Sequence, residues 1–218
     1  MNQQSSSLLS VSETFVSLQG EGAWAGWPCF FIRLSGCNLR CTYCDTRYAY
    51  NKGEKRNIPG LIDEWRQSGI GLVQVTGGEP LLQSGTLTLL EALLNEGATV
   101  LLETNGSLAL RNVPGEVVKI VDRKTPGSGM EEFFLEENLG WLNQGDQLKF
   151  VITGREDYEW AREEVIRLCL SCYTEVLFSP AWGGPVPFQL AEWIIADRLS
   201  VRFQIQLHKI LWGEKRGI

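Results

Sequence analysis

The stretch G-C-N-L-R-C-T-Y-C-D-T at residues 36–46 is the most informative feature of this chain, because it sets Cys37, Cys41 and Cys44 close together. Thiolates are soft ligands that suit iron–sulfur clusters. A [4Fe–4S] cluster held by three protein sulfurs keeps one iron open to a ligand that is not protein. The spacing therefore predicts these three cysteines as metal ligands, with chemistry at the open iron.

Two other uses of cysteine are open to this sequence. A structural zinc site needs four ligands, and the remaining candidates, Cys29, Cys169, Cys172 and His208, do not stand at zinc-ribbon spacing. Disulfides need an oxidising compartment, whereas residues 1–7 are polar and lack a signal-peptide core. We therefore expect reduced thiols in a cytoplasmic protein. Cys169 and Cys172 form C-x-x-C at the end of a helical stretch, which indicates buried free thiols acting as small hydrophobes; a second cluster is the alternative.

The composition favours a globular protein with a small-molecule substrate. The chain has 218 residues, 44% of them hydrophobic, which is enough for a buried core in one domain spanning residues 1–218. No apolar run reaches the roughly 18 residues that a membrane span needs. The formal net charge is -6 and the basic residues are scattered, so the sequence lacks the electrostatic footprint of a nucleic-acid-binding protein.

Apolar runs alternate with helical periodicity along the chain, and several runs are apolar on both faces, as buried parallel strands are. The predicted strands cover residues 29–34, 71–75, 99–102, 117–121, 147–152, 175–178 and 202–205. The predicted helices cover residues 58–67, 86–95, 156–172 and 186–197. This alternation indicates an α/β fold with a parallel sheet. Ligands of such sheets bind beyond the carboxyl ends of the strands, here at Cys37, Gly77, Asn105, Lys124, Gly154 and Pro180.

A second motif strengthens the interpretation of the cysteines. The spacing C-x-x-x-C-x-x-C, with Tyr43 before the third cysteine and T-G-G-E-P at residues 76–80, resembles the radical S-adenosylmethionine superfamily. In that superfamily the open iron holds the amino and carboxylate groups of S-adenosylmethionine, and an electron from the cluster cleaves it to a 5′-deoxyadenosyl radical. The resemblance implies an open, incomplete (partial) TIM-type barrel of parallel strands, which the predicted strands fit better than a closed barrel of eight.

A narrower resemblance covers nearly the whole chain. The segments that carry it are E-T-F-V-S-L-Q-G-E-G (13–22), L-L-E-T-N-G (101–106), V-D-R-K-T-P-G-S-G (121–129), L-K-F-V-I (148–152) and Q-I-Q-L-H-K-I-L-W-G-E-K-R-G-I (204–218). Together they resemble the 7-carboxy-7-deazaguanine synthase family. The resemblance implies ring contraction of 6-carboxy-5,6,7,8-tetrahydropterin to 7-carboxy-7-deazaguanine with loss of ammonia, on the route to queuosine. The alternatives are an activating enzyme for a glycyl-radical protein, which would lack segments 13–22 and 204–218, and a non-catalytic iron–sulfur or zinc-binding module.

The substrate positions implied by the family suit a pterin. Glu21 offers a carboxylate that can accept two N–H bonds from the amino-pyrimidinone edge. Arg33 lies in a predicted strand, where its guanidinium would bind a substrate carboxylate or form an internal ion pair. The implied substrate-binding set is Leu18, Gln19, Gly20, Glu21, Arg33, Thr76 and the terminal Ile218.

The cofactor positions implied by the family surround the cluster motif and follow later strands. Gly77 and Gly78 have no Cβ, so their loop can approach a ligand closely, and Glu79 would face the ammonium group of S-adenosylmethionine; an ordinary turn closed by Pro80 is the alternative. Thr46 would ligate Mg²⁺, which prefers oxygen donors. The implied cofactor-binding set is Tyr43, Cys44, Asp45, Gly78, Glu79, Asp122, Arg123, Lys124, Ser179, Pro180, Ala181 and Trp182.

Three further expectations accompany this resemblance. The family often carries S-P-K and Q-P-M-D where this chain has D-R-K (122–124) and S-P-A-W (179–182), so side-chain contacts there are open while backbone contacts persist. His208 either lines the pocket or packs against the fold. The protein is expected to be a homodimer that takes electrons from a donor such as flavodoxin or ferredoxin.

Overall fold

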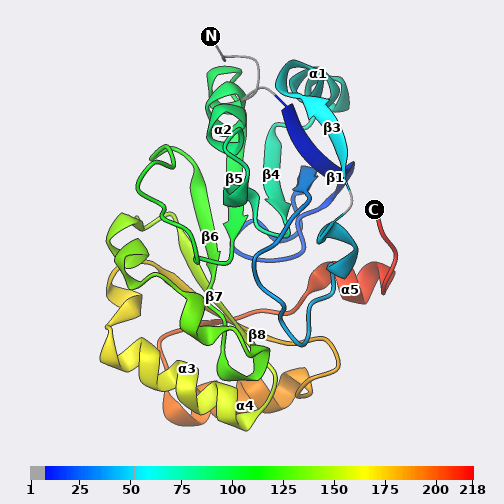
Figure 1. Ribbon diagram of the computed structural model, residues 1–218. Coiled ribbons are helices and arrows are strands. Elements are labelled where there is room, and N and C mark those ends of the chain that lie inside the picture. The colour runs from blue at the N-terminus through cyan, green and yellow to red at the C-terminus, as the bar shows by residue number, and fades with distance from the viewer. Residues whose placement is uncertain (1–7, 52) are drawn as a thin grey trace.

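One twisted sheet organises the computed structural model, which describes residues 8–51 and 53–218 (Figure 1). Over those residues the sheet has nine strands in the order β3-β1-β2-β4-β5-β6-β7-β8-β9. Their bounds are Leu8–Leu18 (β1), Pro28–Leu34 (β2), Glu54–Asn57 (β3), Leu72–Gly77 (β4), Thr99–Thr104 (β5), Val118–Asp122 (β6), Gln147–Ile152 (β7), Glu175–Pro180 (β8) and Arg202–Phe203 (β9).

The sheet is parallel from β2 to β9 and does not close on itself within the described residues. The predicted α/β fold with an open, incomplete barrel is therefore confirmed. Two strands were not predicted from the sequence. β1 pairs antiparallel with β2 on one side and with β3 on the other, so an antiparallel edge extends the parallel sheet.

Four of the five α-helices of the described residues lie between successive strands in the chain and cover one face of the sheet, whereas the last follows β9 (Figure 1). Their bounds are Ile58–Ser68 (α1), Thr86–Asn95 (α2), Arg155–Arg167 (α3), Pro187–Asp197 (α4) and Leu207–Trp212 (α5). Local chemistry sets the ends of α1. The Asn57 side chain caps its first turn by accepting a hydrogen bond from the Gly60 N–H, and Gly69 ends it in the left-handed conformation at φ 68°. Within the described residues, no helix has the length and hydropathy to cross a bilayer.

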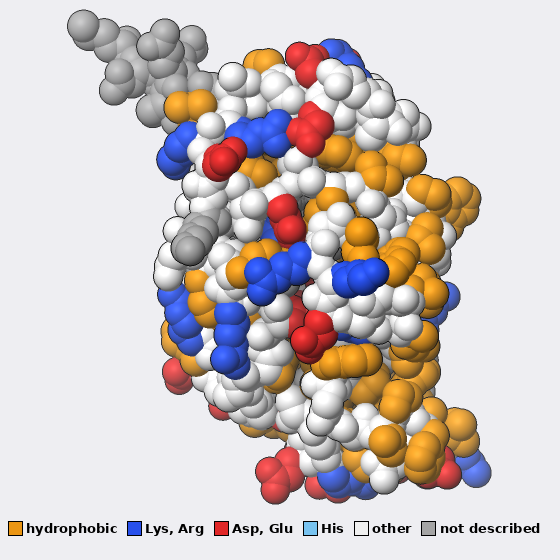
Figure 2. All heavy atoms as spheres, turned by 90° about the vertical axis from the view of Figure 1, so that its right-hand side faces the viewer, with side chains coloured by type: hydrophobic (Ala, Val, Ile, Leu, Met, Phe, Trp, Pro, Cys, Tyr) orange, Lys and Arg blue, Asp and Glu red, His pale blue; other side chains and the backbone are white. Residues whose placement is uncertain are grey.

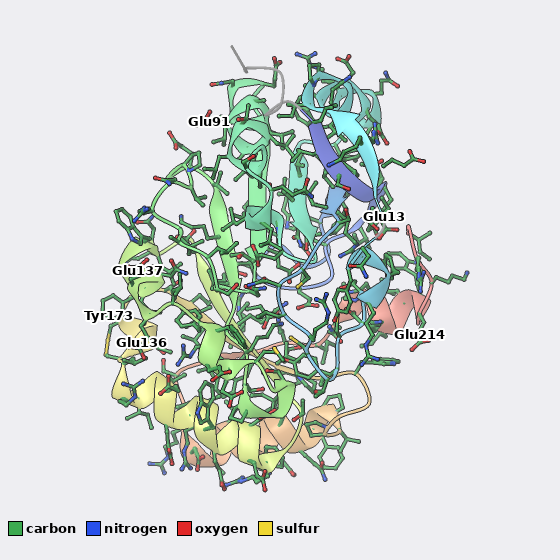
Figure 3. The ribbon with its side chains drawn as sticks, in the orientation of Figure 1. Glu13, Glu91, Glu136, Glu137, Tyr173 and Glu214 are labelled. Carbon is green, nitrogen blue, oxygen red and sulfur yellow. A yellow bond between two sulfur atoms is a disulfide. The ribbon has the colours of Figure 1, made fainter. Side chains whose placement is uncertain are left out.

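The segment after α3 differs from the prediction. The helix ends at Arg167 instead of continuing to residue 172, because Cys169 takes a left-handed conformation at φ 48° and a short 3₁₀ turn follows. Cys169 and Cys172 are exposed on this turn and are joined by a disulfide. The expectation of buried, free thiols was therefore wrong for this pair. Tyr173, the next residue, lies on the opposite side of the molecule from Glu214 (Figure 3).

The two faces of the sheet differ because side chains alternate along each strand. On the helix-covered face, residues such as Val73, Leu102 and Phe150 join the main apolar core. On the other face, a smaller cluster of Cys29, Phe31, Leu72, Leu101 and Ile120 fills only the amino ends of the strands. The same face becomes polar toward the carboxyl ends, where Gln74 and Thr76 follow Leu72, Glu103 follows Leu101, and Asp122 follows Ile120. This gradient places a polar cavity at the carboxyl end of the barrel.

Candidate active site

A cavity of about 640 Å³ opens at the carboxyl ends of the parallel strands. Its walls come from β1, β2 and β4 to β7, together with the cysteine loop and the segment around α5. Figure 3 places Glu13 and Glu214, which both line the cavity, on the same side of the molecule. The sequence-predicted residues that line it are Leu18, Gln19, Gly20, Glu21, Arg33, Cys37, Cys41, Tyr43, Cys44, Asp45, Thr46, Thr76, Gly78, Asp122, Lys124, Ala181, Trp182, His208 and Ile218.

The three cysteines of the motif all face this cavity and are free thiols. The loop that carries them is held by backbone bonds from the Gly36 N–H to the Ala49 carbonyl, at 2.8 Å, and from the Glu79 N–H to the Gly36 carbonyl, also at 2.8 Å. Burial raises the pKa of the Cys37 and Cys41 thiols. Among the described residues, no three His, Cys, Asp or Glu side chains are close enough to share one metal ion. The three thiols that face the cavity suit an iron–sulfur cluster because cysteine thiolates are its usual ligands.

The glycine loop after β4 lies directly against the cysteine loop. A Cβ on Gly77, whose φ is 157°, would meet the Leu34 backbone, and one on Gly78 would meet the Gly36 carbonyl and the Cys37 Cβ. Glycine is therefore required for this close approach. The loop closes one wall of the cavity beside Cys37.

Glu79 has a different environment from the one that the sequence predicts. Its carboxylate is fully buried and accepts hydrogen bonds from the Leu81 N–H at 3.0 Å, the Thr104 hydroxyl at 2.8 Å and the Asn105 N–H at 2.7 Å. Burial raises its pKa. The side chain thus ties the glycine loop to the end of β5, and in this structure it does not lie on the cavity wall.

A charged cluster lines the cavity and is centred on Lys149 of β7. The Lys149 ammonium lies 2.8 Å from a Glu21 oxygen, 2.7 Å from a Glu103 oxygen and 3.4 Å from an Asp122 oxygen. Lys124 pairs with the same Asp122 oxygen at 2.9 Å. Burial acts to lower the pKa of Lys149, but the carboxylates around it outweigh burial and raise that pKa well above its ordinary value.

The sequence left two roles open for Arg33, an internal ion pair and binding of a substrate carboxylate, and its environment agrees with both. Its Nε donates to the Glu13 carboxylate at 2.7 Å, and the Tyr48 hydroxyl donates to the same oxygen at 2.7 Å. The internal ion pair therefore exists. The two terminal nitrogens of Arg33, however, have no hydrogen-bond partner among the described residues, and the side chain lines the cavity. A planar guanidinium that is fixed through Nε can still bind an anion through its other edge.

Some predicted cofactor residues lie away from the cavity wall. The Arg123 guanidinium pairs with Glu164 and lies over the Phe134 and Trp160 rings, 4.3 Å and 5.2 Å from their centroids. It therefore belongs to the packing between β6 and α3. Ser179 and Pro180 are buried at the end of β8, whereas the next two residues reach the cavity.

Several cavity residues were missed from the sequence. Glu103 and Lys149 are charges within apolar strands, which is a detectable signal because buried charges require partners. Gln74 and Gln206 offered no such signal, since glutamine is common on surfaces. Tyr48 and Glu13 became part of the site only through the β1–β2 pairing and the fold of the cysteine loop.

An open parallel barrel with three free cysteines and a glycine loop at its carboxyl end is the architecture of radical S-adenosylmethionine enzymes, and the family model of the Radical SAM superfamily matches residues 31–122. The chain is 42% identical to the 7-carboxy-7-deazaguanine synthase of Chlorobaculum tepidum, across 96% of this chain and 97% of that protein. It is also 42% identical to the synthase of Koribacter versatilis, across 96% and 100%. The chain therefore belongs to the 7-carboxy-7-deazaguanine synthase family.

The structure agrees with this membership. It is similar to the crystal structure of QueE from Escherichia coli, with a TM-score of 0.76 and 26% sequence identity. That likeness covers 92% of this chain and 95% of the solved one. The resemblance stated from the sequence motifs is thus confirmed.

Proposed function

We propose that this enzyme converts 6-carboxy-5,6,7,8-tetrahydropterin to 7-carboxy-7-deazaguanine with loss of ammonia. Its relatives of matching length are 7-carboxy-7-deazaguanine synthases, and its cavity has two features that suit the pterin. One is a carboxylate at Glu21 for ring N–H donors, and the other is a guanidinium at Arg33 for the substrate carboxylate. The observation that carries the proposal is their presence in the cavity that also holds the three cysteines.

The residues present fit a cluster and S-adenosylmethionine. Cys37, Cys41 and Cys44 would hold the cluster, and Gly77 and Gly78 line the same cavity beside Cys37. The Tyr43 hydroxyl and the Asp122 Oδ1 are buried without hydrogen-bond partners among the described residues, so a polar cofactor would satisfy them. When bound, these groups would supply the 5′-deoxyadenosyl radical that abstracts the hydrogen at C6. The protein's part is to orient the pterin and to exclude water.

Substrate orientation follows from the protein groups already in place. The Glu21 carboxylate would accept N–H bonds from the pterin, with Gln19, Gly20 and Leu18 forming the adjacent wall. Arg33 would bind the pterin carboxylate through its terminal nitrogens, with its plane fixed by Glu13. Thr76 and Ile218, which also line the cavity, would contact the substrate from β4 and from α5's side. Thr46 would ligate Mg²⁺ with one hydroxyl, leaving positions for water and substrate oxygens.

The remaining inferences concern the electron donor, the location in the cell and the oligomeric state. Figure 2 shows Lys and Arg side chains, with acidic ones between them, on the face that carries α5. Arg47, Lys209, Lys215 and Arg216 all line the cavity that holds the cysteines. An acidic electron donor, such as flavodoxin or ferredoxin, would be attracted to this face. We further infer a cytoplasmic homodimer, as the family resemblance implies.

The test is anaerobic incubation of the reconstituted enzyme with 6-carboxytetrahydropterin, S-adenosylmethionine and a reductant, followed by mass detection of the product. The proposal expects 7-carboxy-7-deazaguanine, with S-adenosylmethionine regenerated and not consumed. Cleavage of S-adenosylmethionine that requires a protein acceptor and leaves the pterin unchanged would instead support a glycyl-radical activating enzyme.

A further inference from the structure

Lys149 is a buried cation on β7. It is 3% exposed, and three carboxylates lie around its ammonium: those of Glu21, Glu103 and Asp122. An ammonium has three N–H donors and no acceptor. Lys149 donates to Glu21 at 2.8 Å and to Glu103 at 2.7 Å, and the Asp122 carboxylate lies 3.4 Å away as a further ion-pair partner. This geometry ties Lys149 to its acidic partners.

Glu21 and Glu103 differ in how many hydrogen-bond acceptor positions on their carboxylates remain free. Glu21 accepts from Lys149 on one oxygen and from the Gln206 amide, at 3.0 Å, on the other. A carboxylate has about four acceptor positions, so each oxygen of Glu21 keeps one. Glu103 accepts from Gln74 at 2.8 Å and Thr76 at 3.0 Å on one oxygen, and from Lys149 on the other. Glu21 can thus receive two further N–H bonds side by side, while Glu103 is largely occupied by the protein.

The ionisation of Glu21 and Glu103 depends on the positive charge of the Lys149 ammonium group. Burial acts to raise the pKa of both Glu21 and Glu103, but Lys149, together with hydrogen bonds from Gln206 to Glu21 and from Thr76 to Glu103, outweighs burial and lowers the pKa of both. The other charged or titratable groups that face the pair are His208 beside Glu21, Arg33 beside Glu103, and Asp122 with Lys124 on β6. Without Lys149, burial and mutual repulsion would favour a proton on one of the two carboxylates. A protonated Glu21 would lose the acceptor pair that faces the cavity.

We propose that Lys149 is a positioning residue for the substrate: it holds Glu21 and Glu103 side by side as a carboxylate pair, and so keeps both oxygens of Glu21 available to ring N–H donors. This inference rests on the proposed function, in which a pterin is the substrate. Lys149 acts on substrate affinity through the ionisation and direction of Glu21.

The test uses the holoenzyme with Lys149→Met, which keeps the length of the side chain and removes its charge. The dissociation constant of 6-carboxytetrahydropterin is measured anaerobically from pH 6 to pH 9, with S-adenosylmethionine bound. The wild type should show little change across this range. The variant should bind more weakly at pH 7 and recover by up to about tenfold per pH unit as pH rises, because one proton must leave the carboxylate pair before the substrate binds.

Lys119→Met is the matched control. Lys119 is as buried as Lys149 and pairs with Asp146 at 2.9 Å, but it lies on the helix-covered side of β6, outside the cavity. Its loss should lower stability and leave the pH profile of pterin binding unchanged. The double variant Lys149→Met/Glu103→Gln removes one charge of each sign. It should restore a flat profile, and it keeps the test usable if the single variant does not fold.

A measurement without pterin separates this inference from the proposed function. Carbon-13 carboxyl NMR, assigned with Glu21→Gln and Glu103→Gln, should show one of the pair titrating near or above neutral pH in Lys149→Met and neither doing so in the wild type. Two ionised carboxylates in the variant, or weakened binding with a flat pH profile, would overturn the role of Lys149. If the wild type neither binds nor converts the pterin, the proposed function fails, and the NMR titration still decides whether Lys149 maintains the pair.

Discussion

At the residue scale, the site combines side chains whose free groups face the cavity with others whose groups are already used. Arg33 has its Nε bound by Glu13 and its terminal nitrogens open. Glu79, in contrast, has both carboxylate oxygens bound by neighbouring groups of the protein. A charged side chain of this region can therefore be free to bind a ligand or be used to hold a loop. Hydrogen-bond geometry distinguishes the two uses, and residue type alone does not.

Replacing Cys37, Cys41 or Cys44 by alanine should abolish both the absorbance of the reconstituted cluster and turnover, because two thiolates cannot hold the cubane. The control is the double variant Cys169→Ala/Cys172→Ala, which removes the exposed disulfide outside the cavity. It should keep its iron. A double variant that lost iron while Cys41→Ala kept it would show the ligand assignment to be wrong.

Arg33→Ala should weaken pterin binding by about 2–5 kcal/mol, the scale for losing one partner of a buried charged pair. Affinity for S-adenosylmethionine should stay unchanged. Arg56→Ala is a suitable control, because Arg56 pairs with Glu64 in a partly exposed position outside the cavity. Isothermal titration of both ligands with both variants measures the difference. Equal losses for the two ligands in Arg33→Ala would contradict its assignment to the substrate.

At the scale of elements, the alternation of side chains along the strands builds the cavity. β4 places Leu72, Gln74 and Thr76 on the inner face in that order, so one strand contributes in turn to the apolar cluster, the hydrogen-bond network and the cavity wall. The loop that follows β4 can approach the cysteine loop only because Gly77 and Gly78 lack a Cβ. The strand sets the direction of the loop, and the glycines allow the loop to lie close to the cysteine loop.

Gly78→Ala should displace the glycine loop from the cysteine loop and reduce cluster retention, because its new methyl group would meet the Gly36 carbonyl and the Cys37 Cβ. Gly71→Ala is the matched control at the amino end of the same strand, since a Cβ there would have no atom within 4 Å. We expect Gly71→Ala to change stability by only about 0.5 kcal/mol. Iron content after reconstitution compares the two variants. Full iron content in Gly78→Ala would show that the close contact at Gly78 is not needed for cluster binding.

At the scale of the whole molecule, the antiparallel edge, the parallel barrel and α5 meet around one cavity. The Leu207 N–H donates to the Gly20 carbonyl at 3.0 Å, which joins α5 to the loop after β1. A Cβ on Gly20 would overlap the His208 ring, so the two segments are in close contact. Residues 213–218 then continue along the cavity wall. Segments from the two ends of the described chain thus form one side of the site.

Deleting Gly217 and Ile218 should raise KM for the pterin or abolish activity, while iron content and the folded state survive. Both residues line the cavity, and α5 contributes no residue to the buried apolar core within the described residues. Steady-state kinetics and a thermal melt measure the two effects. Unchanged kinetics would show that Gly217 and Ile218 do not contribute to the substrate site.

The buried Glu103–Lys149 pair should make stability depend on pH at both extremes. The pKa of Glu103 is lowered in the folded state, so its stabilising effect is present above the ordinary glutamate pKa and is lost as pH falls toward the folded value. The pKa of Lys149 is raised, so its effect is present at neutral pH and is lost only in strong alkali. Urea unfolding of the apoprotein between pH 3 and 7 should show a steeper loss for the wild type than for Glu103→Gln. Identical slopes would contradict the pairing.

The parallel sheet and the family could both be predicted from the amino-acid sequence, because they depend on local periodicity and on the fixed spacing of motifs such as that of the cysteines. The predicted ends of α2 and the positions of the parallel strands agree with the structure for this reason. Which polar groups remain free to bind a ligand depends instead on contacts between distant segments. The antiparallel pairing of β1 brought Glu13 to Arg33, and the barrel brought Glu21, Glu103 and Lys149 together from positions up to 128 residues apart. Such contacts follow from the packing of distant strands, and no local pattern along the chain specifies them.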